Sequence, residues 1–225
     1  MKLTDRIQYS AAGLTDLVHI VVTGDTSQNP AGSSYKVPLQ QIVDLVSVSP
    51  STQYWTSGST GTNSIKANNG SGLNATGDYA VAEGYNTTAS GSSSHSEGRQ
   101  TTALGTNSHS EGYLTIASGI ASHAEGRENE SIGLNSHAEG RRTTSLGIRS
   151  HSEGESTTAE GDWSHAEGVS TIASGIYSHA EGNSSIASGT ASHTGGYSND
   201  NRASYSFIGS GSGNTIYSAS TFSFI

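Results

Sequence analysis

The chain has 225 residues, a formal net charge of −9, 29 glycines and no cysteine. Without cysteine, neither disulfides nor thiolate metal sites are available. The acidic balance leaves no basic stripe, so we expect no nucleic-acid partner.

Residues 1–50 are predicted to form a small α+β segment. Apolar and alternating patterns predict strands over residues 16–22 and 34–39, and helical spacing directly after Pro38 predicts a helix over residues 39–46. The helix-spaced residues are Leu39, Ile42, Val43 and Val46. A segment of this size buries little surface alone, so we expect it to fold against copies of itself.

The amino terminus lacks the long apolar run of a signal peptide. No stretch of the chain approaches the roughly 20 apolar residues of a membrane span. We therefore expect no membrane insertion.

Residues 51–69 read as a transition between this segment and the repeats that follow. Solenoids commonly carry capping segments at their ends. We expect Trp55 and Ile65 to plug the open end of the repeat region.

Residues 70–196 carry a glycine at every seventh position without a miss. Two unlike sevens alternate, so the full repeat has fourteen residues, with Ser-His-Ala-Glu-Gly at residues 122–126 and again at 136–140. A short fixed period predicts a solenoid, in which each coil packs on its neighbours. The glycines assigned a structural role are Gly77, Gly84, Gly91, Gly98, Gly105, Gly112, Gly119, Gly126, Gly133 and Gly140.

Strand alternation separates the repeat residues into two faces. A five-residue strand ending at each glycine places Ser122, Ala124 and Gly126 together on one face. Because a fourteen-residue coil holds its two sheets closer than the usual ~10 Å, only such small residues fit inside. His123 and Glu125 then point outward.

The outward His and Glu positions form nearly constant columns, whereas the outward positions of the other half-repeat vary. A core of Ser, Ala and Gly buries little apolar surface, so the roll needs partners, and we expect the constant columns to face another chain. The alternative is a solvated face. The columns comprise His95, Glu97, His109, Glu111, His123, Glu125, His137, Glu139, His151, Glu153, His165, Glu167, His179, Glu181 and His193.

Ser, His and Glu are also the ingredients of a hydrolase triad. A triad is made once, at one cleft, whereas this motif recurs in register, and Ser122 is predicted to point away from His123 and Glu125. We therefore predict no catalytic site. A threonine array of the ice-binding type is also disfavoured, because Ile116, Glu130 and Ile172 interrupt that column.

A metal-binding solenoid is a further alternative, because His and Glu can ligate zinc. Eight stacked sites would be unusual, and Ser and Ala provide little support for the ligands. We therefore predict neither a metal nor a cofactor.

Residues 197–225 break the sevenfold rhythm. Phe207 and Ile208 recur as Phe224 and Ile225, seventeen residues on, which predicts the start of a second, aromatic repeat region. The sequence stops within a repeat, so either it was cut there or the natural chain continues past Ile225.

Residues 164–182, SHAEGVSTIASGIYSHAEG, resemble the head repeats of trimeric autotransporter adhesins. The resemblance implies an all-β, left-handed parallel β-roll solenoid of fourteen-residue coils in an intertwined homotrimer. The adhesin heads usually carry Val and Ile where this chain has His and Glu.

The SHAEG motif, together with residues 54–84, is more similar to tail-fibre and baseplate proteins of tailed bacteriophages, and residues 17–46 resemble the attachment segment of such fibres. This second resemblance implies a non-enzymatic trimeric fibre of a phage tail or a related injection particle, assembled in the host cytoplasm and located in the virion. Its implied partners are copies of itself, baseplate or tail proteins at the amino end, and a host receptor contacted beyond Ile225. The alternative is a bacterial surface adhesin head.

Overall fold

The computed structural model describes residues 17–22, 33–38, 55–67, 72–218 and 222–224. All regular secondary structure in these ranges is β-strand. In this described part, no helix has the length and apolarity needed to cross a membrane. The chain divides into two compact units, Met1–Gln53 and Tyr54–Ile225.

The first unit contains a two-stranded antiparallel sheet. Strand β1 (Leu17–Val22) pairs with β2 (Ser33–Pro38), so that Leu17 lies opposite Pro38. Both strands were predicted from the sequence and are confirmed within about one residue. The helix predicted over residues 39–46 lies outside the described residues.

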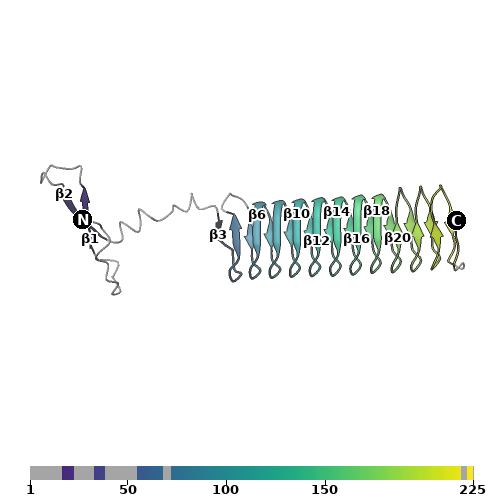
Figure 1. Ribbon diagram of the computed structural model, residues 1–225, viewed down its shortest axis with the longest axis horizontal. Coiled ribbons are helices and arrows are strands. Elements are labelled where there is room, and N and C mark those ends of the chain that lie inside the picture. The colour runs from purple at the N-terminus through teal and green to yellow at the C-terminus, as the bar shows by residue number, and fades with distance from the viewer. Residues whose placement is uncertain (1–16, 23–32, 39–54, 68–71, 219–221, 225) are drawn as a thin grey trace. The chain divides into compact units, whose positions relative to one another are not determined.

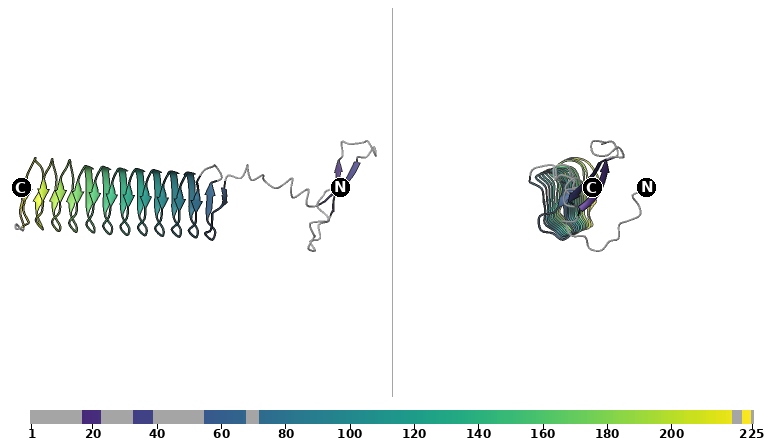
Figure 2. Two further views of the ribbon diagram at one scale, coloured as in Figure 1. Left: turned by 180° about the vertical axis from the view of Figure 1, so that it is seen from behind. Right: turned by 90° about the vertical axis from the view of Figure 1, so that its left-hand side faces the viewer.

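The second unit is a parallel β-solenoid, in which the chain coils and the coils stack side by side (Figure 1). Viewed along the roll, successive coils superimpose (Figure 2). The predicted parallel roll is therefore confirmed. Two sheets run along it, one of twelve strands and one of eleven.

The strands of the twelve-stranded sheet are β3 (Trp55–Ser57), β4 (Ile65–Ala67), β6 (Val81–Tyr85), β8 (His95–Arg99), β10 (His109–Tyr113), β12 (His123–Arg127), β14 (His137–Arg141), β16 (His151–Glu155), β18 (His165–Val169), β20 (His179–Ala180), β22 (His193–Thr194) and β24 (Phe207–Ile208). Those of the eleven-stranded sheet are β5 (Asn74–Ala75), β7 (Thr88–Ala89), β9 (Thr102–Ala103), β11 (Ile116–Ala117), β13 (Glu130–Ser131), β15 (Thr144–Ser145), β17 (Thr158–Ala159), β19 (Ile172–Ala173), β21 (Ile186–Ala187), β23 (Asp200–Asn201) and β25 (Thr215–Ile216).

Strand pairing follows the fourteen-residue period. His123 pairs with His137 in the twelve-stranded sheet, and Glu130 pairs with Thr144 in the eleven-stranded sheet. Equivalent side chains of successive coils are therefore direct neighbours.

The roll is longer than the predicted 70–196 segment. Strand β4 already pairs in parallel with β6, and beyond Gly196 strands β24 and β25 continue the two sheets. Asp200 pairs with Thr215, fifteen residues on, and Phe207 bridges to Phe224, seventeen residues on. Residues after Gly196 therefore form longer coils of the same roll, because the corners accommodate the extra residues.

The first strand pairing of the roll is antiparallel, between β3 and β4. Trp55 is 40% exposed and Ile65 is 41% exposed. The prediction that they plug the open end is therefore wrong. Instead, β3 lies beside β4 and occupies the edge of the twelve-stranded sheet, where unpaired backbone groups would otherwise be presented.

The interior consists of small side chains, as predicted. Ser122, Ala124 and Ser131 are at most 1% exposed. The Ser122 hydroxyl donates to the carbonyl of Gly119 at 2.8 Å, and serines of other coils repeat this bond at the same corner. Such bonds satisfy the buried hydroxyls.

The two glycine columns differ, which corrects the predicted inward face. Gly133 is buried, whereas Gly126 and Gly140 are exposed. Gly140 has φ +102°, so the chain turns outward at this position and the alternation of the strand ends there. In both columns a Cβ atom would collide with the next coil, at 1.9 Å from the carbonyl oxygen of Gly147 in the case of Gly133.

Candidate functional site

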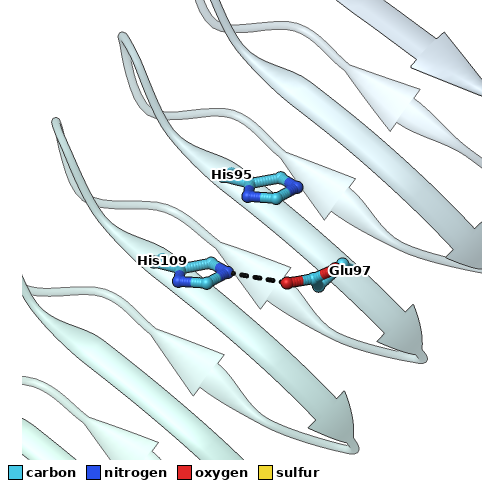
Figure 3. Close-up of side chains that lie close together, drawn as sticks. All are labelled: His95, Glu97 and His109. Carbon is cyan, nitrogen blue, oxygen red and sulfur yellow. Dashed lines mark hydrogen bonds and ion pairs between the residues drawn. The ribbon is translucent and has the colours of Figure 1, made fainter.

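The predicted His and Glu columns lie side by side on the outer face of the twelve-stranded sheet. His is the first residue and Glu the third of strands β8 to β18, so both point away from the interior. Together they form what we call the His/Glu ladder, the fifteen residues named above. Figure 3 shows its first rungs, with His95 above His109 and Glu97 reaching toward the His109 ring.

The histidine rings are stacked along the roll. The centroids of His123 and His137 are 4.7 Å apart and their planes differ by 3°. Neighbouring pairs from His95 to His179 repeat this arrangement at 4.7 to 4.9 Å. The stack follows from strand pairing, because in-register parallel strands place identical residues one strand spacing apart.

Each histidine lies close to the glutamate of the preceding coil. The Nε2 atom of His109 is 3.2 Å from Oε1 of Glu97, and that of His179 is 3.1 Å from Oε1 of Glu167. Towards the middle of the ladder the spacing widens, to 3.9 Å between His137 Nε2 and Glu125 Oε1. The side chains are about one-third exposed, 35% for His137 and 32% for Glu125.

Several histidines of the ladder leave one ring nitrogen unsatisfied. The Nε2 atoms concerned are buried and make no hydrogen bond, and their nearest glutamate oxygens lie 3.4 to 3.9 Å away. They belong to His95, His123, His137, His151 and His165. A buried polar atom without a partner is costly, so these atoms favour any group that supplies one.

The glutamates line an open groove. Its walls are six Glu-Gly pairs in successive coils, from Glu97-Gly98 to Glu167-Gly168. Glycine adds no side chain beside the carboxylates, so the groove stays accessible along its length. Among the described residues, every ion pair of the column from Glu97 to Glu181 is made with a histidine, whereas Arg141 pairs with Glu155 at the neighbouring corner.

The stacked carboxyls shift one another's pKa. Hydrogen bonds with the carboxyls of Glu111 and Glu139 raise the pKa of Glu125 to about 7, and burial adds to the rise. The reciprocal hydrogen bond with Glu125 lowers the pKa of both neighbours. Hydrogen bonds with neighbouring carboxyls likewise raise the pKa of Glu153 to about 7. The titration of one carboxyl therefore depends on its neighbours in the column, and the shifted pKa values belong to the column as a set.

Burial lowers the pKa of His123, His137 and His165, and the neighbouring imidazoles lower it further. Removal from water disfavours the charged ring, and a charged neighbour at stacking distance disfavours it again. At these three positions burial outweighs the attraction of the glutamates, so the rings are neutral near pH 7.

A catalytic triad is not formed by the SHAEG motif. The Ser122 hydroxyl is buried and donates to Gly119, on the opposite side of the strand from His123 and Glu125. The same corner bond holds Ser136 and Ser150. Ser122 therefore points away from His123 and Glu125, as strand alternation predicted.

One exposed surface was missed by the sequence analysis. Large apolar residues gather on the outer face of the eleven-stranded sheet and at the corner that follows it; we call this the apolar surface. Ile120 is 55% exposed and Leu134 is 40% exposed, and the Asn135 amide donates to the Ile120 carbonyl at 2.9 Å. The surface comprises Leu104, Ile116, Ile120, Ile132, Leu134, Leu146, Ile148 and Ile176. The signal was present in the sequence, since several lie directly before or after a glycine of the buried column.

The repeats match the family model of the YadA head domain repeat. The matched segments are residues 74–87, 82–108 and 166–192. The roll is similar to that head. No curated protein matches the chain. The match indicates that the coils with the SHAEG motif have an adhesin-type structural fold. In this chain the outward side chains of that motif are His and Glu.

Proposed function

We propose that this chain is a non-enzymatic attachment module, an adhesin-like head that functions as a homotrimer. The match to the YadA head domain repeat, on a roll with fourteen-residue coils, carries this proposal. The interior of small side chains supports the homotrimer, because Ala, Ser and Gly bury too little apolar surface to stabilise a single roll without partner chains.

The His/Glu ladder is proposed as one of the surfaces between chains. A threefold ring is heterologous, so each chain must present two different surfaces to its neighbours. The described residues offer the repetitive ladder on one face and, on another, the apolar surface, which Ser118, Glu160 and Ser174 interrupt. Exposed apolar residues in a contiguous set are typical of protein interfaces.

The mass of the full chain in solution tests the homotrimer. The monomer has a mass of 23.0 kDa, so a trimer has about 69 kDa, three times that value. We expect sedimentation equilibrium to give the larger mass at micromolar concentration. A folded monomer that shows no association over this range contradicts the proposal.

A bacteriophage tail fibre, or a fibre of a related injection particle, is the second candidate. The similarity of residues 54–84 and of residues 17–46 to such fibres favours it. The amino-terminal unit then docks on baseplate or tail proteins, and the roll projects toward a host surface.

Immunogold electron microscopy distinguishes the two candidates. Antibodies against the roll label the surface of intact bacteria if the chain is a surface adhesin. They label one end of purified tailed particles if it is a fibre. In the second case, deletion of residues 1–50 should leave the roll folded and remove the label from the particles.

A further inference from the structure

We propose that the His/Glu ladder binds divalent transition-metal ions of the zinc class, each held by side chains of two successive coils. Groups of three residues place one ligand atom each within 4.8 Å of one another. The groups are His95-Glu97-His109, His123-Glu125-His137, His137-Glu139-His151, Glu153-His165-Glu167 and Glu167-His179-Glu181.

The spacing of the ligand atoms fits a small ion. Zinc binds nitrogen and carboxylate oxygen at about 2.0 to 2.2 Å, so two ligands of a tetrahedral ion lie about 3.3 to 3.5 Å apart. His123 Nε2 lies 3.7 Å from Glu125 Oε2, and His137 Nε2 lies 3.9 Å from Glu125 Oε1. Small side-chain rotations bring these atoms to ligand distance, because the groove side of the carboxylate is open.

The unsatisfied imidazole nitrogens point to the ligand. All five histidines whose buried Nε2 atoms lack a hydrogen-bond partner belong to these groups. A neutral imidazole presents a free lone pair at one nitrogen, and that lone pair is what a metal ion requires. Coordination therefore satisfies a nitrogen that the roll leaves without a hydrogen bond, with a glutamate oxygen already 3.4 to 3.9 Å away as a second ligand.

The charge of the groove favours a cation. Carboxyls of successive coils lie one above another at strand spacing, and like charges at this distance repel. Among the described residues, no arginine or lysine pairs with the column from Glu97 to Glu167. A bound divalent ion removes that repulsion.

The choice of metal follows from the mixed ligands. Calcium and magnesium prefer oxygen ligands throughout, whereas imidazole nitrogen suits zinc, nickel and copper. The groups supply three protein ligands, which leaves one position of a tetrahedral ion for water or, where the ladder lies between chains of the proposed trimer, for a group of the neighbouring chain.

The sharing of residues sets the number of ions. Two of the five groups share His137 and two share Glu167, so three groups can be filled at one time. We expect three ions in each chain, spaced about two coils, or roughly 10 Å, apart along the roll. The sequence-based objection to eight stacked sites therefore does not apply.

Calorimetric titration with zinc chloride tests the inference on the full chain without an affinity tag, after removal of metals with a chelator. We expect about three zinc ions per chain with micromolar or tighter affinity, and at least tenfold weaker binding of calcium. His137→Gln removes two groups at once and should lower the number to two, and His109→Gln should also lower it to two. The double variant should bind one ion.

His19→Gln is the matched control, because His19 is the one histidine outside the ladder. It should retain three ions. Circular dichroism of each variant shows whether the roll is folded, and heating with and without zinc provides a second measurement, since an ion that binds only the folded chain raises Tm. Zinc should raise the Tm of the parent more than that of the folded double variant.

Three outcomes overturn the inference. The first is no binding at 100-fold excess of zinc, and the second is calcium binding equal to that of zinc. The third is a stoichiometry that the folded His137→Gln and His109→Gln variants leave unchanged.

Discussion

The two sheets of the roll share one interior but carry different surfaces. Strands β8 to β18 of the twelve-stranded sheet have five residues and repeat His and Glu at the same outward positions. Strands of the eleven-stranded sheet have two residues, and their outward residue changes from Ile116 to Glu130 to Thr144 in successive coils. The inner positions of both sheets stay small up to β22, and Ile208 and Ile216 are buried at the inner positions of β24 and β25. The fold therefore restricts the size of the interior side chains and tolerates different side chains on the outside. Formation of the roll does not explain why the outward His and Glu residues of the ladder are the same in successive coils.

Each of the two sheets has its own column of glycines. Replacing a glycine of either column should have the largest effect on the stability of the roll. Gly133→Val places a Cβ atom 1.9 Å from the Gly147 carbonyl oxygen, and Gly140→Val adds a branched side chain at φ +102°. We expect each to destabilise the roll by about 3 kcal/mol or more, because backbone atoms of the next coil cannot give way. Thermal unfolding should show a Tm lower by roughly 6 to 12 °C, or no soluble protein.

Glu160→Gln is the matched control for Gly133→Val, because Glu160 precedes Gly161 as Ile132 precedes Gly133, and its side chain is exposed and lies outside the apolar surface. Its Tm should stay within about 1 °C of the parent, as expected for a surface substitution. A Gly133→Val variant as stable as this control contradicts the close approach of the coils.

An interior polar residue joins the two sheets at one level. Asn129 is 1% exposed, donates to the Gly140 carbonyl at 2.8 Å and accepts from the Thr143 amide at 2.9 Å. Asn129→Ala leaves the buried Thr143 amide without its partner, which should cost about 1 to 3 kcal/mol.

Asn129→Thr tests whether this cost belongs to the lost hydrogen bonds. Other coils carry threonine at the equivalent position, where Thr115 donates to the Glu111 carbonyl at 2.9 Å. Chemical denaturation should place Asn129→Thr between the parent and Asn129→Ala. Equal stability of the two variants would show that the hydroxyl supplies nothing at this position.

The glutamates of the ladder should affect the pH dependence of the roll's stability, whereas those of the eleven-stranded sheet should not. The pKa of Glu125 and of Glu153 is raised to about 7, above the usual value of 4.5. The folded roll holds these protons more tightly than the unfolded chain, so their stabilising contribution is full below about pH 4.5 and is lost as the pH rises through about 7. The double variant Glu125→Gln/Glu153→Gln should therefore have a higher Tm than the parent at pH 8.5 and a similar Tm near pH 5.

The corresponding variant of the eleven-stranded sheet is Glu130→Gln/Glu160→Gln. Scanning fluorimetry in a buffer with chelator should show that this control keeps the parent's pH profile. If both double variants shift the profile equally, the effect comes from net charge and not from the stacked carboxyls.

The histidines should produce the smallest effect, because their side chains are partly exposed. The pKa of His123, His137 and His165 is lowered by burial, so their contribution to stability is full above about pH 6.5 and is lost as the pH falls through the lowered values. The parent should lose more Tm between pH 7 and pH 5 than the triple His→Gln variant does, again with chelator present. An equal loss would mean that these rings titrate as they do in water.

The sequence predicted the repeat, its period and the distribution of side chains. Glycine at every seventh residue and small residues at alternating positions are local patterns, and one coil repeats them for the next. In-register stacking then follows, since a solenoid places identical residues side by side. For this reason the outward direction of His123 and the inward direction of Ser122 could be read from the spacing alone.

Other features depended on how neighbouring coils meet. The exposure of Gly140 comes from its backbone angle, and the continuation of the roll past Gly196 comes from corners that hold an extra residue without disturbing strand pairing. Neither leaves a trace in the seven-residue pattern. The exposed positions of Trp55 and Ile65 likewise follow from the antiparallel β3, which an apolar side chain does not indicate.

The His/Glu ladder shows most directly which features the sequence determined and which the tertiary structure determined. The sequence by itself determined that His and Glu recur every fourteen residues on the outside of a parallel roll. Only the tertiary structure decided that five Nε2 atoms are buried without a hydrogen bond, that neighbouring carboxyls raise the pKa of Glu125, and that four of the five ligand groups overlap in pairs at His137 and Glu167. The physical reason is that hydrogen bonding, desolvation and coordination depend on distances of a few ångströms between side chains of different coils, whereas the period specifies only which side chains become neighbours.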